Sequence, residues 1–159
     1  MTFSEIVTFI SVIVAIVALI IELRLSRLAL YTQVILELDK EFYSGWVSQR
    51  RQEAAKKILN GQVADREIED ILDFFADIGI LLERGALDKD LVYDVYSYWI
   101  LYYWRLGQDV IKRNRMTDPE SWLVVERMVK HLEKESKLDY SPRAIDSFVL
   151  EEAKKEKSG

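Results

Sequence analysis

The sequence has no cysteine, a single histidine, two prolines and six glycines among its 159 residues. Without cysteine it has neither disulfide bonds nor thiolate chemistry, which fits a reducing compartment. One histidine, His131, excludes a site with several histidine ligands within one chain. The scarcity of glycine and proline argues against a turn-rich β protein and favours an all-α fold.

The common sequence signatures of catalysis are also missing. There is no glycine loop that could cradle a phosphate, no nucleophile elbow and no Cys/His metal-binding pattern. We therefore predict a protein that is not an enzyme and that holds no metal and no cofactor.

Charge is patterned along the chain, whose net charge is −5. Acidic residues dominate 65–94, and basic residues dominate 105–115. A general nucleic-acid binder is basic overall, so we do not expect nucleic acid as a partner. Opposite charges on two stretches instead predict complementary faces, with an ion pair between Asp77 and Arg113. Asp77 also shares a helix face with Asp70 and Asp73, which leaves a divalent-cation site as the alternative.

The longest apolar run lies at the N-terminus. Residues 6–21 carry no charge and are apolar on every side of a helix. With the adjoining apolar residues the run reaches about 20 residues, and at about 1.5 Å per residue this approaches the roughly 30 Å hydrocarbon core of a bilayer. We therefore predict that residues 1–23 are a transmembrane anchor. Its span includes Ile6, Ile10, Val14, Val17 and Ile21.

A cleaved signal peptide and a buried core helix are the alternatives for this segment. A signal peptide has a basic start and a small-residue cleavage site, whereas this chain has Glu5 before the run and Glu22-Leu23-Arg24-Leu25 after it. A helix at the edge of a soluble core has a polar stripe. Because Arg24 and Arg27 follow the run and no basic residue precedes it, the positive-inside rule places the N-terminus outside and the rest in the cytosol, at the inner (plasma) membrane.

Helical periodicity continues beyond the anchor. We expect one continuous helix from about residue 3 to residue 44. Shorter helices are expected over 46–60, 65–84, 88–115, 117–137 and from 142 onward. The helix from 117 has a strong start signal, because Pro119 would occupy its first turn. The prediction is a cytosolic bundle of about five helices over residues 24–150, followed by a disordered tail over 151–159.

The expected helix over 88–115 carries aromatic side chains on nearly every side. One interpretation is a central helix in the hydrophobic core of the domain. The other is a subunit interface, in which tyrosine and tryptophan are enriched. We predict that part of this surface is a homo-oligomer interface. The residues assigned to it are Tyr93, Tyr96, Trp99 and Tyr103.

Arg127 and His131 are weak catalytic candidates. Their i,i+4 spacing puts both on one helix face, where two basic groups could act on a phosphodiester, as in HEPN-type ribonucleases. The spacing is shorter than in those enzymes, and Met128 stands where they carry a polar residue. A histidine on the surface of an amphipathic helix is the plainer interpretation.

Residues 71–104 combine paired aromatics, a glycine turn and an aromatic-rich helix. The residues that carry this pattern are Asp73, Phe74, Phe75, Gly85, Leu87, Asp88, Leu91, Tyr98 and Trp104. The pattern resembles an uncharacterised family of small bacterial and archaeal proteins. The resemblance implies an N-terminal transmembrane helix with a helical cytosolic domain, and no known activity. The architecture is also similar to that of small membrane accessory proteins of RNA-targeting CRISPR systems, which assemble into a pore.

The leading hypothesis is a non-enzymatic, membrane-anchored helical protein that self-associates, with the lipid bilayer and further copies of itself as partners. Clustered anchors could form an oligomeric membrane assembly or a pore, although Thr8 and Ser11 are too sparse to predict a wide hydrophilic channel. The alternatives are a monotopic tether for a cytosolic protein partner and a degenerate HEPN-like RNA-processing module.

Overall fold

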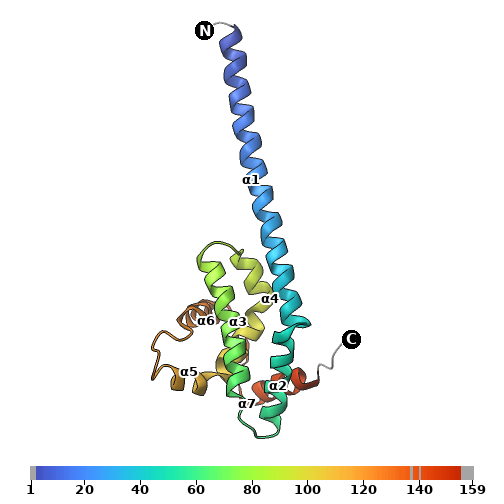
Figure 1. The fold of residues 1–159 in the computed structure, drawn as a ribbon, viewed down its shortest axis with the longest axis vertical. Helices are drawn as coiled ribbons and strands as arrows, with labels where there is room; N and C mark the ends of the chain where they lie inside the picture. The colour runs from blue at the N-terminus through green and yellow to red at the C-terminus, as the bar shows by residue number, and fades with distance from the viewer. Residues whose placement is uncertain (1–2, 137, 140, 155–159) are drawn as a thin grey trace. The chain divides into compact units, whose positions relative to one another are not determined.

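The computed structural model describes residues 3–136, 138–139 and 141–154, with side chains from Thr8 onward except at residue 135. Over these residues it contains seven α-helices and no strand (Figure 1). The prediction of an all-α fold is confirmed. The chain divides into two compact units, residues 1–36 and 37–159, and each is described separately.

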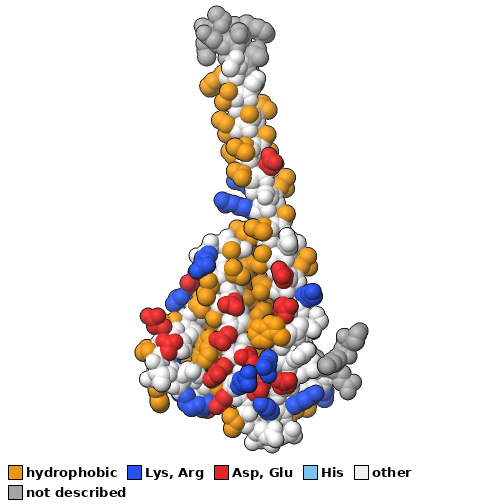
Figure 2. All heavy atoms as spheres, viewed as in Figure 1, with side chains coloured by type: hydrophobic (Ala, Val, Ile, Leu, Met, Phe, Trp, Pro, Cys, Tyr) orange, Lys and Arg blue, Asp and Glu red, His pale blue; other side chains and the backbone are white. Residues whose placement is uncertain are grey.

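The first unit consists of helix α1, which spans Phe3–Tyr43 and contributes its residues up to 36. This helix contains a stretch long and apolar enough to cross a membrane, and none of that stretch is buried within the protein. Figure 2 shows hydrophobic side chains along the visible face of this segment. Of the predicted span residues, Ile10, Val14, Val17 and Ile21 are 50–61% exposed. The side chain of Ile6 lies outside the described part.

The second unit contains residues 37–43 of α1 and six further helices. These are α2 (Trp46–Leu59), α3 (Asp65–Glu83), α4 (Lys89–Leu106), α5 (Gln108–Asn114), α6 (Leu123–Glu135) and α7 (Pro142–Lys154). Helix α3 packs against α2, α4, α5 and α6, while α7 packs against α2 and α4. The core of the unit therefore forms around α3 and α4.

The buried face of α3 follows from its sequence. Ile68, Ile71, Leu72, Phe75 and Ile78 recur at the spacing of one helix face and are at most 3% exposed. The helix begins at Asp65, close to the predicted start, and the turn after it contains Gly85 at φ +66°. Glycine adopts this left-handed conformation readily and ends many helices.

Gly107 divides the expected helix over 88–115 into α4 and α5. A Cβ atom at this position would lie 3.0 Å from Leu72 Cδ1 and 3.1 Å from Ile68 Cγ2. The absence of a side chain thus allows α3 to pack closely at the junction. This break explains why the second unit has one helix more than the sequence predicted.

The predicted helix start at residue 117 was wrong, because α6 begins at Leu123. The Asp118 carboxylate accepts hydrogen bonds from the Glu120 backbone N–H (3.1 Å) and from the Ser121 hydroxyl (3.0 Å). These bonds stabilise a turn, and Trp122 then adopts φ +55° at the N-cap of α6. A short polar side chain that satisfies local backbone groups competes with helix formation.

The predicted tail over 151–159 was placed too early. Helix α7 continues to Lys154, and Glu152 within it is 2% exposed. The last turn of α7 therefore belongs to the second unit. Residues 155–159 lie outside the described residues.

Candidate functional site

Several aromatic side chains of α4 are buried in the core of the second unit. Tyr96 is fully buried and Tyr103 is 1% exposed, whereas Tyr93 and Trp99 are half-buried. The prediction of a subunit interface was wrong for Tyr96 and Tyr103. The reason is that α4 is contacted by α3, α5, α6 and α7 of the same chain, so most of its circumference is already covered.

Phe42, at the end of α1, is the centre of an aromatic cluster within the second unit. Its ring lies 5.1 Å from Trp99, 5.3 Å from Tyr96 and 5.7 Å from Phe74, measured between ring centroids. The Tyr96 hydroxyl also donates a hydrogen bond to Asp39 Oδ1 at 2.5 Å. Burial, together with this bond to a carboxylate, raises the pKa of the Tyr96 phenol.

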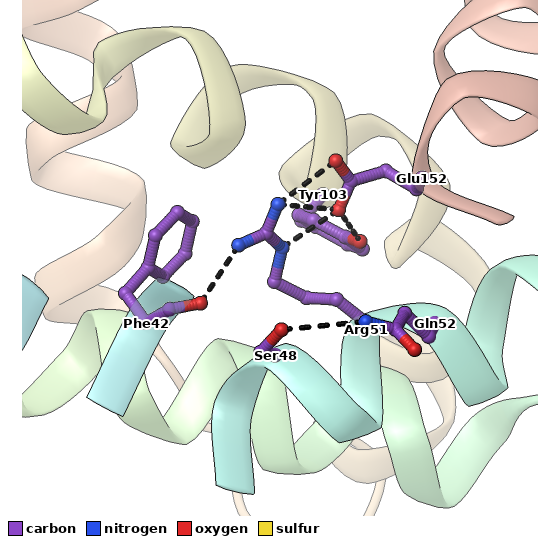
Figure 3. Close-up of polar contacts among 6 residues, drawn as sticks. All are labelled: Phe42, Ser48, Arg51, Gln52, Tyr103 and Glu152. Carbon is purple, nitrogen blue, oxygen red and sulfur yellow. Dashed lines mark hydrogen bonds and ion pairs between the residues drawn. The ribbon is translucent and has the colours of Figure 1, made fainter. Parts of the chain in front are cut away.

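A buried ion pair lies beside this cluster (Figure 3). Arg51 of α2 and Glu152 of α7 are each 2% exposed. Arg51 Nε donates to Glu152 Oε2 at 2.7 Å, and Arg51 Nη2 donates to Glu152 Oε1 at 2.8 Å. Parallel bonds of this kind are the strongest geometry available to a guanidinium and a carboxylate.

Arg51 and Glu152 also form hydrogen bonds with other groups. Arg51 Nη1 donates to the backbone carbonyl of Phe42 at 2.9 Å, and the Tyr103 hydroxyl donates to Glu152 Oε2 at 3.0 Å. The guanidinium carbon lies 3.9 Å from the centroid of the Phe42 ring, a favourable cation–π distance. Burial and the neighbouring Glu152 raise the pKa of the Tyr103 phenol. The network thereby connects the end of α1 with α2, α4 and α7.

Arg127 and His131 line a groove of about 240 Å³ between α3, α4 and α6. Arg127 forms an exposed ion pair with Glu83, with 2.6 Å between Nη2 and Oε1. The His131 ring lies 5.3 Å from the ring of Tyr93. Both residues therefore line the same groove. Arg127 has an ion-pair partner on α3, and His131 has a ring-packing partner on α4.

A family model described as Domain of unknown function (DUF4760) matches residues 5–132. This chain belongs to the DUF4760 family. The predicted resemblance to an uncharacterised family is thereby confirmed. Neither the curated proteins nor the solved structures compared with the chain gave a match.

The DUF4760 match extends from the apolar part of α1 into α6, and α7 lies beyond it. Arg51, Phe42 and Tyr103 are thus within the DUF4760 region, while their partner Glu152 is outside it. The candidate residues Arg24 and Arg27 follow the apolar stretch within the match and are exposed.

The predicted ion pair between Asp77 and Arg113 does not form. Arg113 Nη2 instead contacts Asp65 Oδ2 at 2.5 Å, and Asp77 is exposed. Helix α5 packs on α3, and Arg113 meets α3 at Asp65, in the first turn of that helix. Asp77 lies about three turns further along α3, because an α-helix has about 3.6 residues per turn. Asp70 and Asp73, the other members of the acidic row, contact Arg50 at 2.8 Å and Trp122 Nε1 at 2.7 Å. These carboxylates bind side chains of other segments within the DUF4760 region.

Proposed function

We propose that this DUF4760 protein is a single-pass membrane protein, in which residues 6–21 cross the bilayer and the second unit faces the cytosol. The observation that carries the proposal is the exposure of a long, uncharged helical segment on all sides. Soluble monomers rarely expose contiguous apolar patches larger than roughly a few hundred Å². Lipid would cover this surface, and a helix satisfies every backbone hydrogen bond inside the bilayer.

The proposed orientation rests on Arg24 and Arg27. Both are exposed and follow the apolar stretch directly. Basic residues flanking a span are retained on the cytoplasmic side, so the N-terminus would lie outside and the second unit inside.

We further propose that the protein acts by association and not by catalysis, with self-association as the leading form. Tyr43 and Trp46 are 50% and 46% exposed on the second unit. The Tyr43 ring also contacts half-buried Trp99, with 5.8 Å between centroids. Tyrosine and tryptophan are the residues that most often dominate the binding energy of interfaces. This exposed aromatic surface takes the place of the buried α4 residues as the proposed contact between copies.

Catalysis is not part of the proposal because the two candidate catalytic side chains in the groove, Arg127 and His131, each contact a side chain of another helix. The guanidinium of Arg127 is bound to Glu83, and the His131 ring packs near Tyr93. These contacts support packing roles for both residues.

Mass measurement of the full-length protein in detergent tests self-association. We expect a species heavier than the monomer, and we expect the double variant Tyr43→Ala/Trp46→Ala to weaken association by about thirtyfold or more, because each side chain would remove about 1 kcal/mol or more of binding energy. Leu59→Ala, at another exposed apolar position (49% exposed), is the matched control and should associate like the wild type. A monomer at every concentration would remove self-association and favour the second candidate, a tether that uses the same surface for a cytosolic partner.

A further inference from the structure

We propose that residues 22–36 of α1 pair side by side with the same segment of a second copy. The contact, called the seam below, consists of Leu25, Leu28, Thr32 and Leu36. The inference rests on the membrane anchoring and self-association proposed above. It adds a contact along α1 to the one proposed at Tyr43 and Trp46.

The seam forms one face of α1 within the first unit. Its residues are three, four and four positions apart, which places them in a row along a helix with about 3.6 residues per turn. Leu25 and Leu28 are each 62% exposed, and Leu36 is 63% exposed, so the described part of the chain leaves these leucines largely uncovered.

Thr32 is the polar residue in this row. Its hydroxyl donates a hydrogen bond to the backbone carbonyl of Leu28 at 3.0 Å, so the hydroxyl has a partner that does not depend on water. A polar side chain whose hydrogen bond is already made can be buried at a low cost. The seam can therefore be covered by another apolar surface along its whole length.

The distance from the bilayer argues against lipid as the cover of the seam. Arg24 follows the apolar stretch and marks the boundary of the proposed span. At about 1.5 Å per residue, Leu36 lies about 18 Å beyond Arg24 along the helix. A row of exposed leucines in water is unfavourable, and such rows mark protein contacts. A protein surface is therefore the expected cover.

A second copy fits the seam by direction. Single-pass chains with one orientation leave the bilayer parallel to one another and at the same depth. Identical residues of neighbouring copies then lie at equal height, so that the seam of one copy faces the seam of the next. Two helices that each expose an apolar row bury it by packing the rows together.

A second copy also fits by charge. Glu22 lies on one flank of the seam and Arg24 on the other, because they precede Leu25 by three residues and by one. In a parallel pair, the basic flank of each helix lies beside the acidic flank of its neighbour, as in coiled coils. Both side chains are exposed, and neither forms an ion pair within the described part of its own chain. Both are thus available to a neighbouring copy.

The opposite face of α1 supplies a matched control. Leu23 and Leu30 each lie two residues from a seam leucine, which is about 200° around the helix. They are 55% and 57% exposed, close to the values of the seam leucines. The two sets have the same side chain and lie along the same part of α1, and they differ in the direction they face.

Cysteine cross-linking in membranes tests the seam, since the chain has no native cysteine. Full-length variants with one cysteine each would be expressed at equal levels, and the isolated membranes would be oxidised with copper phenanthroline. The seam variants are Leu25→Cys, Leu28→Cys and Leu36→Cys, and the control variants are Leu23→Cys and Leu30→Cys. We expect the yield of disulfide-linked dimer to be at least severalfold higher for the seam variants than for the controls.

Equal yields on the two faces, or a higher yield for the controls, would overturn pairing through the seam. If mass measurement still finds an oligomer in that case, self-association stands and the surface at Tyr43 and Trp46 carries it. Equal yields together with a monomer at every concentration would remove both proposals. Low yields at all five positions would leave lipid or another protein as the cover of the seam, and would equally overturn its pairing with a second copy.

Discussion

Replacing Glu152 by alanine is expected to lower the free energy of unfolding of the second unit by about 3–5 kcal/mol, because removal of one partner leaves the other as an uncompensated buried charge. Arg51 would keep its bond to the Phe42 carbonyl but lose both bonds to the carboxylate. The Tyr103 hydroxyl would lose its acceptor as well. No other ion pair in the described part of the chain has both side chains as deeply buried.

Denaturant unfolding of the full-length protein in detergent, followed by the fluorescence of its four tryptophans, measures this loss. Glu133→Ala is the matched control, since Glu133 pairs with Arg105 at the surface with the two side chains 35% and 43% exposed. Such exposed pairs contribute about 0–1 kcal/mol. The apolar double replacement Arg51→Met/Glu152→Leu should recover most of the stability lost in Glu152→Ala, because it leaves no buried charge. A loss for Glu152→Ala as small as that for Glu133→Ala would contradict a structural role of the pair.

The double variant Val14→Arg/Val17→Arg is expected to abolish stable membrane insertion. Both residues lie near the middle of the apolar stretch, and an arginine at the centre of a span costs about 2.5–3.5 kcal/mol on insertion scales, so two cost about 5–7 kcal/mol. The fraction of the protein in sedimented membranes after cell lysis is the measurement. Leu25→Arg/Leu28→Arg, which adds the same charge beyond the stretch, should leave that fraction unchanged. Retention of the Val14→Arg/Val17→Arg variant at the wild-type level would mean that the segment does not enter lipid.

Features that depend on local sequence were predictable. The helix over residues 3–44, the buried face of α3 and the all-α fold all follow from periodicity and composition, which act within a few residues. The helix stop near Gly61 and the turn at Gly85 likewise follow from the freedom of glycine to adopt positive φ.

Features that depend on distant partners were not predictable in the same way. Arg51 and Glu152 are 101 residues apart, and in sequence each resembles an ordinary charged surface residue. The row of aromatics on α4 gave no sign of which rings would be covered, because that depends on Phe42 and Phe148 from other helices. The pairing of Arg113 with Asp65 instead of Asp77 depends on where α5 meets α3, which charge patterning alone does not specify.

Labelling of right-side-out membrane vesicles tests the central claim, that residues 6–21 cross a bilayer with the second unit in the cytosol. Full-length variants with a single cysteine, Thr2→Cys or Asn60→Cys, would be treated with a membrane-impermeant maleimide and then washed at alkaline pH. Asn60 is exposed on the second unit, so its protection would come from the membrane. We predict that both variants stay with the membranes, that the Thr2→Cys variant is labelled in intact vesicles, and that the Asn60→Cys variant is labelled after detergent is added. Release of the protein by the alkaline wash, or equal labelling of both variants in intact vesicles, would contradict the claim.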